Sequence, residues 1–462
     1  MTQAPIRFRS GQRNKWLLAV AGLLIFLAGC GNLATEPTQD AQRNAPAYVV
    51  TVELAEGDTR ESVARSIGGE IVVWQDTTYS LEGEYLSGYA VIGVDEPPLG
   101  AQSANAGSVF EPNRGRLLAG GEMAFMNGRS SIWAGGRSSI WAGGRSSIWA
   151  DGRSGIWADG RSSLWADGQF TWLPENTAAW QQIRLEQGQS LARNLGEGVM
   201  VAVLDTGVDL DHPALIASFA DESLWWDFYD GDALPQEEGT YDDDGFGHGT
   251  NVAGVIRQIA PFATILPLRV LGPDGGGDVD SVVAAIQHAV DSGAHIINLS
   301  LGSDTRIAAL ERAISSATAQ GVFVIASTGN TGDRNVSFPA LIADSDRYML
   351  SVTSVAADDN KSGFATYGNM IELAAPGEHV FGPAPDMLMA AWSGTSMAAP
   401  MASGALALAM GEDLWRDHKH LADELYRQGA DLYTGHINVG YRNQVGNGRL
   451  DVEAFLERVL AK

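Results

Sequence analysis

The strongest constraint on the fold is a set of short, continuously apolar segments in the second half of the chain. They occupy residues 199–204, 265–270, 295–299, 322–326 and 349–355. Between them lie stretches with helical spacing of apolar residues, at 248–256, 279–292 and 308–320. Continuous apolar strands separated by helices are typical of a parallel sheet that is covered on both faces. The sequence therefore predicts a three-layer α/β domain, with its site at the carboxyl ends of the strands.

Three glycine-flanked motifs lie at the ends of these elements. Asp205 ends the first strand in Val-Leu-Asp-Thr-Gly, and His248 opens a helix in His-Gly-Thr-Asn-Val-Ala-Gly. Ser396 begins another helix in Gly-Thr-Ser-Met-Ala-Ala-Pro. A hydroxyl nucleophile, an imidazole base and a carboxylate that orients the base are the groups that cleave an amide through an acyl intermediate. The start of a helix also offers an N–H and a positive dipole end to an oxyanion.

The order Asp, His, Ser, with separations of 43 and 148 residues, resembles the subtilisin-like serine proteases. The resemblance covers about residues 170–460. It implies a serine endopeptidase with these three residues as its triad and Asn330, in Ser-Thr-Gly-Asn, as a second oxyanion donor. It also implies that an extended polypeptide substrate pairs with two backbone edges. The residues of these edges are Gly275, Gly276 and Gly277 on one side and Ser300, Leu301 and Gly302 on the other.

No cofactor is expected for the chemistry, but the same resemblance extends to a metal site. The loop Asp-Phe-Tyr-Asp-Gly-Asp-Ala-Leu-Pro-Gln resembles a calcium loop of thermitase-like members of the family. Side-chain oxygens of this kind are the ligands that calcium prefers. A solvated acidic loop is the alternative interpretation. The implied ligands of a structural calcium are Asp227, Asp230, Asp232 and Gln236.

The amino terminus has the layout of an export signal, because four basic residues precede a short apolar run at 16–27. This run is too short to span a bilayer. It ends in Leu-Ala-Gly-Cys, which resembles a bacterial lipobox, so Cys30 is expected to carry a diacylglycerol. We therefore expect residues 1–29 to be a lipoprotein signal peptide. The protein would be exported and anchored to a bacterial membrane, the outer one where two are present; an ordinary signal peptide with a chance cysteine is the alternative.

The next two segments predict a tether and a small α+β module. Residues 30–46 are small and polar, as in flexible linkers. Residues 47–96 show strand patterns at 48–53, 70–74 and 89–94 and a helix at 59–67, capped by Asp58 or Thr59. This pattern resembles the propeptide inhibitors of subtilisin-like proteases. An unrelated small domain is the alternative.

Residues 97–171 are expected to form a linker that contains an octapeptide repeat at 128–168. The unit Gly-Arg-Ser-Ser-Ile-Trp-Ala brings five tryptophans at a spacing of eight, from Trp133 to Trp165. An even period would put all of them on one face of short strands, so a β-meander or small solenoid is one interpretation. A low-complexity linker is the other. Exposed tryptophans favour an envelope or protein partner.

Charge excludes one class of function. The 462-residue chain has 56 acidic and 30 basic residues and a formal charge of −26, which argues against nucleic-acid binding. The leading prediction is a lipid-anchored serine endopeptidase that acts on polypeptides, with its peptidase domain at 172–462. The rival is a catalytically silent envelope-binding lipoprotein that uses the tryptophan repeat. An active enzyme should lose activity below about pH 6, because a histidine base must be neutral.

Overall fold

The computed structural model describes residues 45–55, 57–76, 78–79, 85–96, 109–113, 117–119, 174–412, 418–434 and 437–461. The expected signal peptide with Cys30, most of the tether and the octapeptide repeat lie outside the described residues. Within these ranges, no helix is both long enough and apolar enough to cross a membrane.

Seven strands form the central sheet, and every neighbouring pair runs parallel. The five predicted strands are all present, each with both ends within one residue of expectation, so the predicted α/β class is confirmed. The two edge strands had not been predicted, because one is very short and the other lacks a long apolar run. In sheet order the strands are β16 (Leu373–Pro376), β15 (Met349–Val355), β14 (Phe323–Ser327), β12 (Ile296–Leu299), β8 (Met200–Asp205), β10 (Thr264–Arg269) and β9 (Trp226–Asp227).

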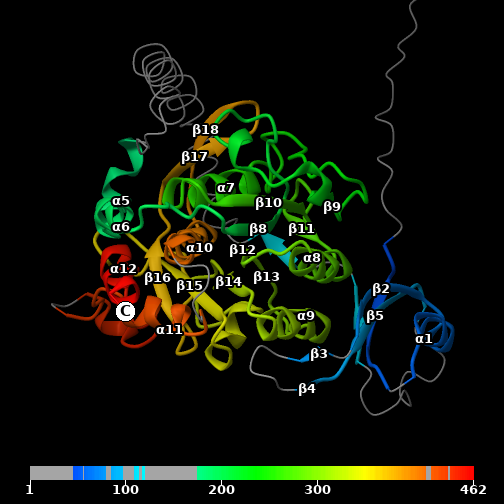
Figure 1. Ribbon diagram of the computed structural model, residues 1–462. Helices are drawn as coiled ribbons and strands as arrows, with labels where there is room; N and C mark the ends of the chain where they lie inside the picture. Colours follow the sequence, from blue (N-terminus) through cyan, green and yellow to red (C-terminus); the bar gives the residue numbers. More distant parts are fainter. Residues whose placement is uncertain are drawn as a thin grey trace, which may run out of the picture. The chain divides into compact units, whose positions relative to one another are not determined.

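Helices cover both faces of this sheet (Figure 1). On one face lie α7 (His248–Ile259) and α10 (Thr395–Glu412), and on the other α8 (Val279–Asp291) and α9 (Ala308–Ala319). Side chains of β8 alternate between the two apolar clusters. Val201 and Val203 pack with α7 and α10, whereas Ala202 and Leu204 pack with α8 and α9. Because both faces are buried, apolar residues predominate on both faces of these strands.

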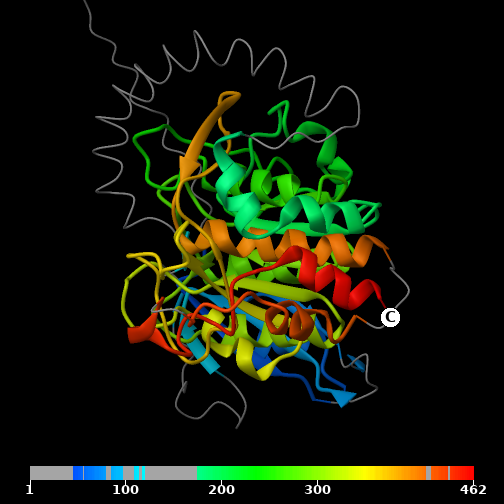
Figure 2. The same ribbon diagram turned by 90° about the vertical axis from the view of Figure 1, so that its left-hand side faces the viewer.

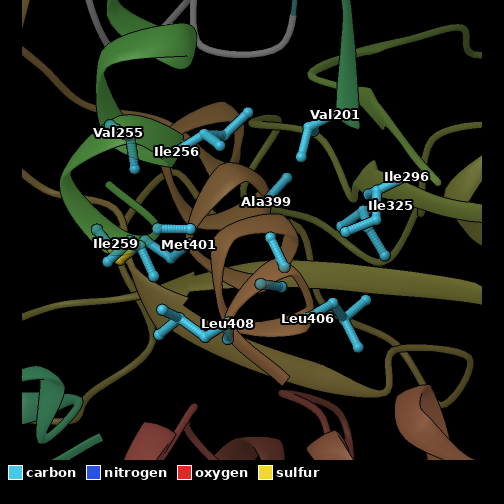
Figure 3. Packing of buried hydrophobic residues seen from close by; sticks show 14 of the residues in the cluster. Val201, Val255, Ile256, Ile259, Ile296, Ile325, Ala399, Met401, Leu406 and Leu408 are labelled. Atoms are coloured by element: carbon cyan, nitrogen blue, oxygen red, sulfur yellow. The ribbon is translucent and has the colours of Figure 1, made fainter. Parts of the chain in front are cut away.

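The helices α7 and α10 pack closely against each other (Figure 3). In Figure 2, α10 is the orange helix, with α12 (Val452–Leu460) in red beside it. A glycine makes the contact with α7 possible, because a Cβ on Gly404 would stand 2.5 Å from the Cβ of Ile259. Gly404 follows Ser396 by eight residues, and Ile259 follows His248 by eleven. Trp392, just before α10, lies against the ring of His248 at the start of α7, so the two helices begin on the same side of the domain.

Smaller elements complete the layer around α7 and α10. The hairpin of β17 (Val380–Ala384) and β18 (Leu388–Trp392) lies against α7. Three short helices join α12 in this layer: α5 (Thr177–Gln182), α6 (Leu185–Leu191) and α11 (Leu421–Arg427).

A second, antiparallel sheet forms the small module, which we define as the described residues between 45 and 113. Its strand order is β2 (Glu70–Gln75), β5 (Tyr89–Val94), β1 (Tyr48–Glu53) and β6 (Val109–Pro112). The helix α1 (Arg60–Ile67) begins one residue later than expected, because Thr59 is its N-cap in a capping box. The strand β6 lies in the segment that was expected to be a linker, and this part of the prediction was wrong. Two-residue strands β3 (Thr78–Tyr79) and β4 (Tyr85–Leu86) pair with each other.

The strand β6 supplies caps to two helices of the peptidase domain. The Glu111 carboxylate accepts hydrogen bonds from the N–H groups of Ala308 and Ala309, at 2.8 and 3.0 Å, where α9 begins. Asn113 is fully buried and exchanges two hydrogen bonds of 2.9 Å with Asp280 in the first turn of α8. The N–H groups of a first helical turn have no partners within the helix. The small module therefore completes the starts of α8 and α9.

Candidate active site

Asp205 and His248 meet where β8 ends and α7 begins. His248 Nδ1 lies 2.6 Å from Asp205 Oδ1, and both side chains are buried. The same oxygen accepts a hydrogen bond of 2.8 Å from the Thr206 N–H. Gly249 permits the approach, because a Cβ there would stand 2.2 Å from the Gly207 carbonyl oxygen and 3.2 Å from Asp205 Oδ1. With a carboxylate on Nδ1, proton transfer falls to Nε2 of the ring.

Ser396 is the second residue of α10, and it is buried against the end of β12. Its Oγ donates to the Ser300 carbonyl oxygen at 3.3 Å, and Ser300 Oγ donates to the Ser396 carbonyl oxygen at 2.9 Å. Trp392, four residues earlier, packs edge-on against the His248 ring, with ring centroids 5.6 Å apart. Together with the packing of α7 on α10, these contacts bring the start of α10 to the side of His248.

Asn330 follows β14, and its side chain points to the start of α10. Its Oδ1 accepts hydrogen bonds from the N–H and the hydroxyl of Thr395, at 2.9 and 3.1 Å. The amide orientation is thereby fixed, with Nδ2 on the other side. This Nδ2 is buried and has no hydrogen-bond partner among the described residues. A buried donor without a partner costs free energy, and such a donor beside a nucleophile is suited to an oxyanion.

The two predicted substrate edges lie on either side of a third strand, which belongs to the chain itself. The strand β7 (Leu117–Ala119) runs antiparallel between β11 (Gly276–Gly277) and β13 (Leu301–Gly302). Leu118 is paired with Gly276 on one side and with Gly302 on the other. Of the predicted edges, Gly275 and Ser300 lie just outside these short ladders. The site thus holds an extended segment between two backbone edges.

Comparison with known proteins is consistent with this geometry. The family model described as the subtilase family matches residues 196–442, slightly more than half of the chain. The chain belongs to the subtilase family. Thermitase from Thermoactinomyces vulgaris is 36% identical over 238 residues, which are 49% of this chain and 80% of thermitase. Subtilisin BL from Lederbergia lenta is 34% identical over 289 residues, which are 60% of this chain and 97% of that protein.

These relatives establish the activity that the three motifs had predicted. The protein is a subtilisin-like serine endopeptidase. An alkaline protease from Shouchella clausii is likewise 34% identical over 289 residues and matches over 69% of its own length. All three motif residues of this subtilase lie within the matched range.

Two of the four calcium ligands implied by the sequence contact an arginine in this subtilase. Asp227 and Asp230 converge on the buried Arg269, whose Nη1 lies 2.8 and 2.6 Å from their carboxylate oxygens. Asp232 accepts from the Leu234 N–H, and Gln236 Oε1 accepts from the Leu210 N–H. In the described ranges, no group of three or more His, Cys, Asp or Glu side chains is arranged to hold a metal ion. The guanidinium of Arg269 thus contacts two of the four implied calcium ligands, and the calcium site stays a prediction.

The sequence also missed a buried carboxyl beside the Asp205–His248 pair. Glu237 is 4% exposed, and burial raises its pKa to about 8. The hydroxyl of Thr206, the N–H of Gly247 and the hydroxyl of Thr250 face this carboxyl and oppose the rise, whereas the charge of Asp205 adds to it. No motif marks Glu237, because its neighbours come from segments that are distant in the sequence.

Proposed function

We propose that Asp205, His248 and Ser396 are the catalytic triad of this endopeptidase. Ser396 Oγ attacks the carbonyl carbon of the scissile amide while His248 Nε2 takes its proton. The histidine then gives that proton to the leaving amine, and water releases the acyl group by the reverse sequence. The observation that carries the proposal is the buried contact of 2.6 Å between Asp205 and His248, because the carboxylate stabilises the imidazolium that forms.

The proposed oxyanion site is formed by Asn330 Nδ2 and the backbone N–H of Ser396. Support comes from the fixed orientation of the Asn330 amide and from its unpaired, buried Nδ2. Preorganised donors of this kind stabilise the charge that develops on the carbonyl oxygen. The substrate would lie as an extended strand between β11 and β13, in the position that β7 occupies here.

We further propose that the small module, together with the strand β7 that follows it, is an intramolecular inhibitor of the propeptide type. Two observations support this: β6 caps α8 and α9, and β7 occupies the place proposed for the substrate. An unrelated small domain would have no reason to make both contacts. The protein would then be produced as an inactive precursor that becomes active after a cut in the chain.

Export and lipid anchoring through Cys30 complete the proposal and are supported by the sequence alone. The octapeptide repeat would bind an envelope component or a protein partner. Membership of the subtilase family and the geometry around Asp205, His248 and Asn330 favour the enzyme over the rival prediction of a catalytically silent lipoprotein.

One labelling experiment tests the triad, processing and lipid together. The full chain, produced with its membrane fraction, is treated with a fluorophosphonate probe, and the mature product is measured by mass spectrometry. We expect label on Ser396, a chain shortened by self-cleavage, and a diacylglycerol on Cys30. The variant Ser396→Ala should remain uncut and take up no label, and its kcat should fall by about 10⁶-fold. Peptide hydrolysis by purified Ser396→Ala would contradict the mechanism, and an unlabelled wild-type chain would favour the silent lipoprotein.

A further inference from the structure

The helix that carries His248 has no N-cap side chain of its own. Gly247 occupies the N-cap position with φ of 91°, and it has no side chain that could accept a hydrogen bond from the first turn. The His248 N–H bonds to the Gly245 carbonyl oxygen at 3.0 Å. The next two N–H groups bond to side chains from elsewhere: Gly249 to Thr206 Oγ1 at 3.0 Å, and Thr250 to Glu237 Oε2 at 3.1 Å. Without such partners, the first turn of a helix frays.

Glu237 reaches this position because its segment lies against the residues that follow Asp205. Its N–H donates to the Val208 carbonyl oxygen at 3.0 Å, and the Val208 N–H donates to the Pro235 carbonyl oxygen at 3.0 Å. Gly207, with φ of 102°, is needed for this approach, since a Cβ there would stand 2.8 Å from the Gln236 carbonyl oxygen. The backbone around Glu237 is thus fixed to the end of β8.

The side chain of Glu237 then joins that strand end to α7. Its Oε2 also accepts the Thr250 hydroxyl at 2.9 Å, and Thr250 Oγ1 in turn accepts the Asp209 N–H at 2.9 Å. From this geometry, and resting on the triad proposed above, we propose that Glu237 is a positioning residue for His248. It caps α7 from outside the helix and thereby holds the imidazole in register with Asp205 and Ser396.

A purely structural role would be a poor explanation for a carboxyl at this place. A buried carboxyl loses its hydration, and an apolar side chain of similar volume is often as stabilising or more so. Glu237 makes two hydrogen bonds to Thr250 through one carboxyl oxygen, Oε2. The benefit of the carboxyl is therefore that it fixes the start of α7, since Thr250 follows His248 by two residues.

The test compares two variants of Glu237 by turnover per active site. The active sites of each purified enzyme are counted with a fluorophosphonate, so that misfolded protein does not enter the rate. Glu237→Leu removes the acceptor and should lower kcat by about 10²-fold with KM changed less than about twofold, as expected for a displaced catalytic group. Glu237→Gln keeps an acceptor oxygen for Thr250 and should stay within about threefold of the wild type.

The adjacent Glu238 provides the matched control, since its side chain is 58% exposed. Glu238→Gln replaces a carboxyl one residue away and should leave kcat unchanged. If Glu237→Leu does not fold, the pair Thr250→Val and Thr250→Ser replaces it. Loss of the hydroxyl in the valine variant should lower kcat about tenfold, and serine should restore it.

Three results would overturn the proposal. They are a wild-type kcat per site in Glu237→Leu, a loss that appears in KM instead of kcat, or equal losses in the leucine and glutamine variants. A wild-type enzyme that is not labelled at all would refute the triad itself, so the two failures can be told apart.

Discussion

The starts of α7 and α10 resemble each other in position and differ in how their polar groups are satisfied. Each carries a residue of the proposed triad in its first turn, and the two helices pack against each other. At α7, the first three N–H groups have partners, and Asp205 holds the histidine ring. At α10, Thr395 and Ser300 fix the backbone, while the nearby Asn330 Nδ2 is left without a partner among the described residues.

The difference corresponds to two kinds of task. A general base must be held in one orientation, and a complete set of hydrogen bonds does this. An oxyanion site must keep a donor available until the substrate supplies the charge, and leaving a buried donor unpaired costs about 1–3 kcal/mol. The fixed start of α7 and the open donor beside α10 can be tested separately.

After the loss expected for Ser396→Ala, the largest effect is expected on the α7 side. Asp205→Asn keeps the shape of the side chain but removes the charge and favours the wrong tautomer of His248. We expect kcat to fall by about 10⁴-fold with little change in fold. Steady-state kinetics and circular dichroism of the purified variant measure the two quantities, and a loss below about tenfold would contradict the role of Asp205.

On the α10 side, Asn330→Leu should lower kcat by about 10²- to 10³-fold with a nearly constant KM, because the donor acts only in the transition state. Asn335→Leu is the control in the same loop, since the Asn335 amide bonds to Asp333. Equal losses in the two variants would show that the loop, and not the donor, matters.

A smaller effect is expected when the Asn330 amide loses one of its two anchors. Thr395→Val removes the hydroxyl that donates to Oδ1 at 3.1 Å but keeps the N–H bond of 2.9 Å. The amide becomes less strictly oriented, and kcat should fall by about tenfold at most. Thr395→Ser should restore the activity; failure of serine to do so would point to packing.

The smallest effect is expected at a second buried carboxyl, Glu372, which belongs to neither helix start. This carboxyl accepts a hydrogen bond of 3.1 Å from the Ser351 N–H. Burial raises its pKa to about 8, and the Ser351 N–H opposes the rise. The folded state therefore binds the proton more tightly than the unfolded chain, so stability is lost as the pH rises from about 5 to 8.

Glu372→Gln cannot lose this proton. In the inactive Ser396→Ala background, which prevents self-digestion, it should reduce the fall in unfolding free energy between pH 5 and 8 by on the order of 2 kcal/mol. Urea unfolding at the two pH values measures the change, and kcat in the active background should stay constant. A changed kcat would show that Glu372, like Glu237, acts on the catalytic site.

Sequence patterns predicted the core sheet well because its strands are buried on both faces. Segments such as 322–326 are apolar throughout, and glycine-flanked motifs mark the ends where Asp205, His248 and Ser396 lie. Asn330 was found from its motif, although its fixed amide and unpaired Nδ2 became visible only in the structure.

Contacts between segments that are far apart in the chain could not be predicted from the sequence. Glu237 reaches α7 only because Gly207 admits its backbone, and no periodic pattern encodes that approach. The contact of Arg269 with Asp227 and Asp230 is a similar case, because Arg269 lies about 40 residues downstream and no local pattern indicates the contact. The roles of Cys30 and the tryptophan repeat stay predictions.

The strand β7 has a kinetic consequence, because it is covalently joined to the enzyme whose edges it pairs with. A tethered competitor has an effective concentration set by its connecting chain, of millimolar order for short flexible links. Dilution lowers the concentration of free peptides but leaves this value unchanged. Blockade of the groove would therefore persist at any enzyme concentration, until the tether is cut and the strand becomes an ordinary, dilutable ligand.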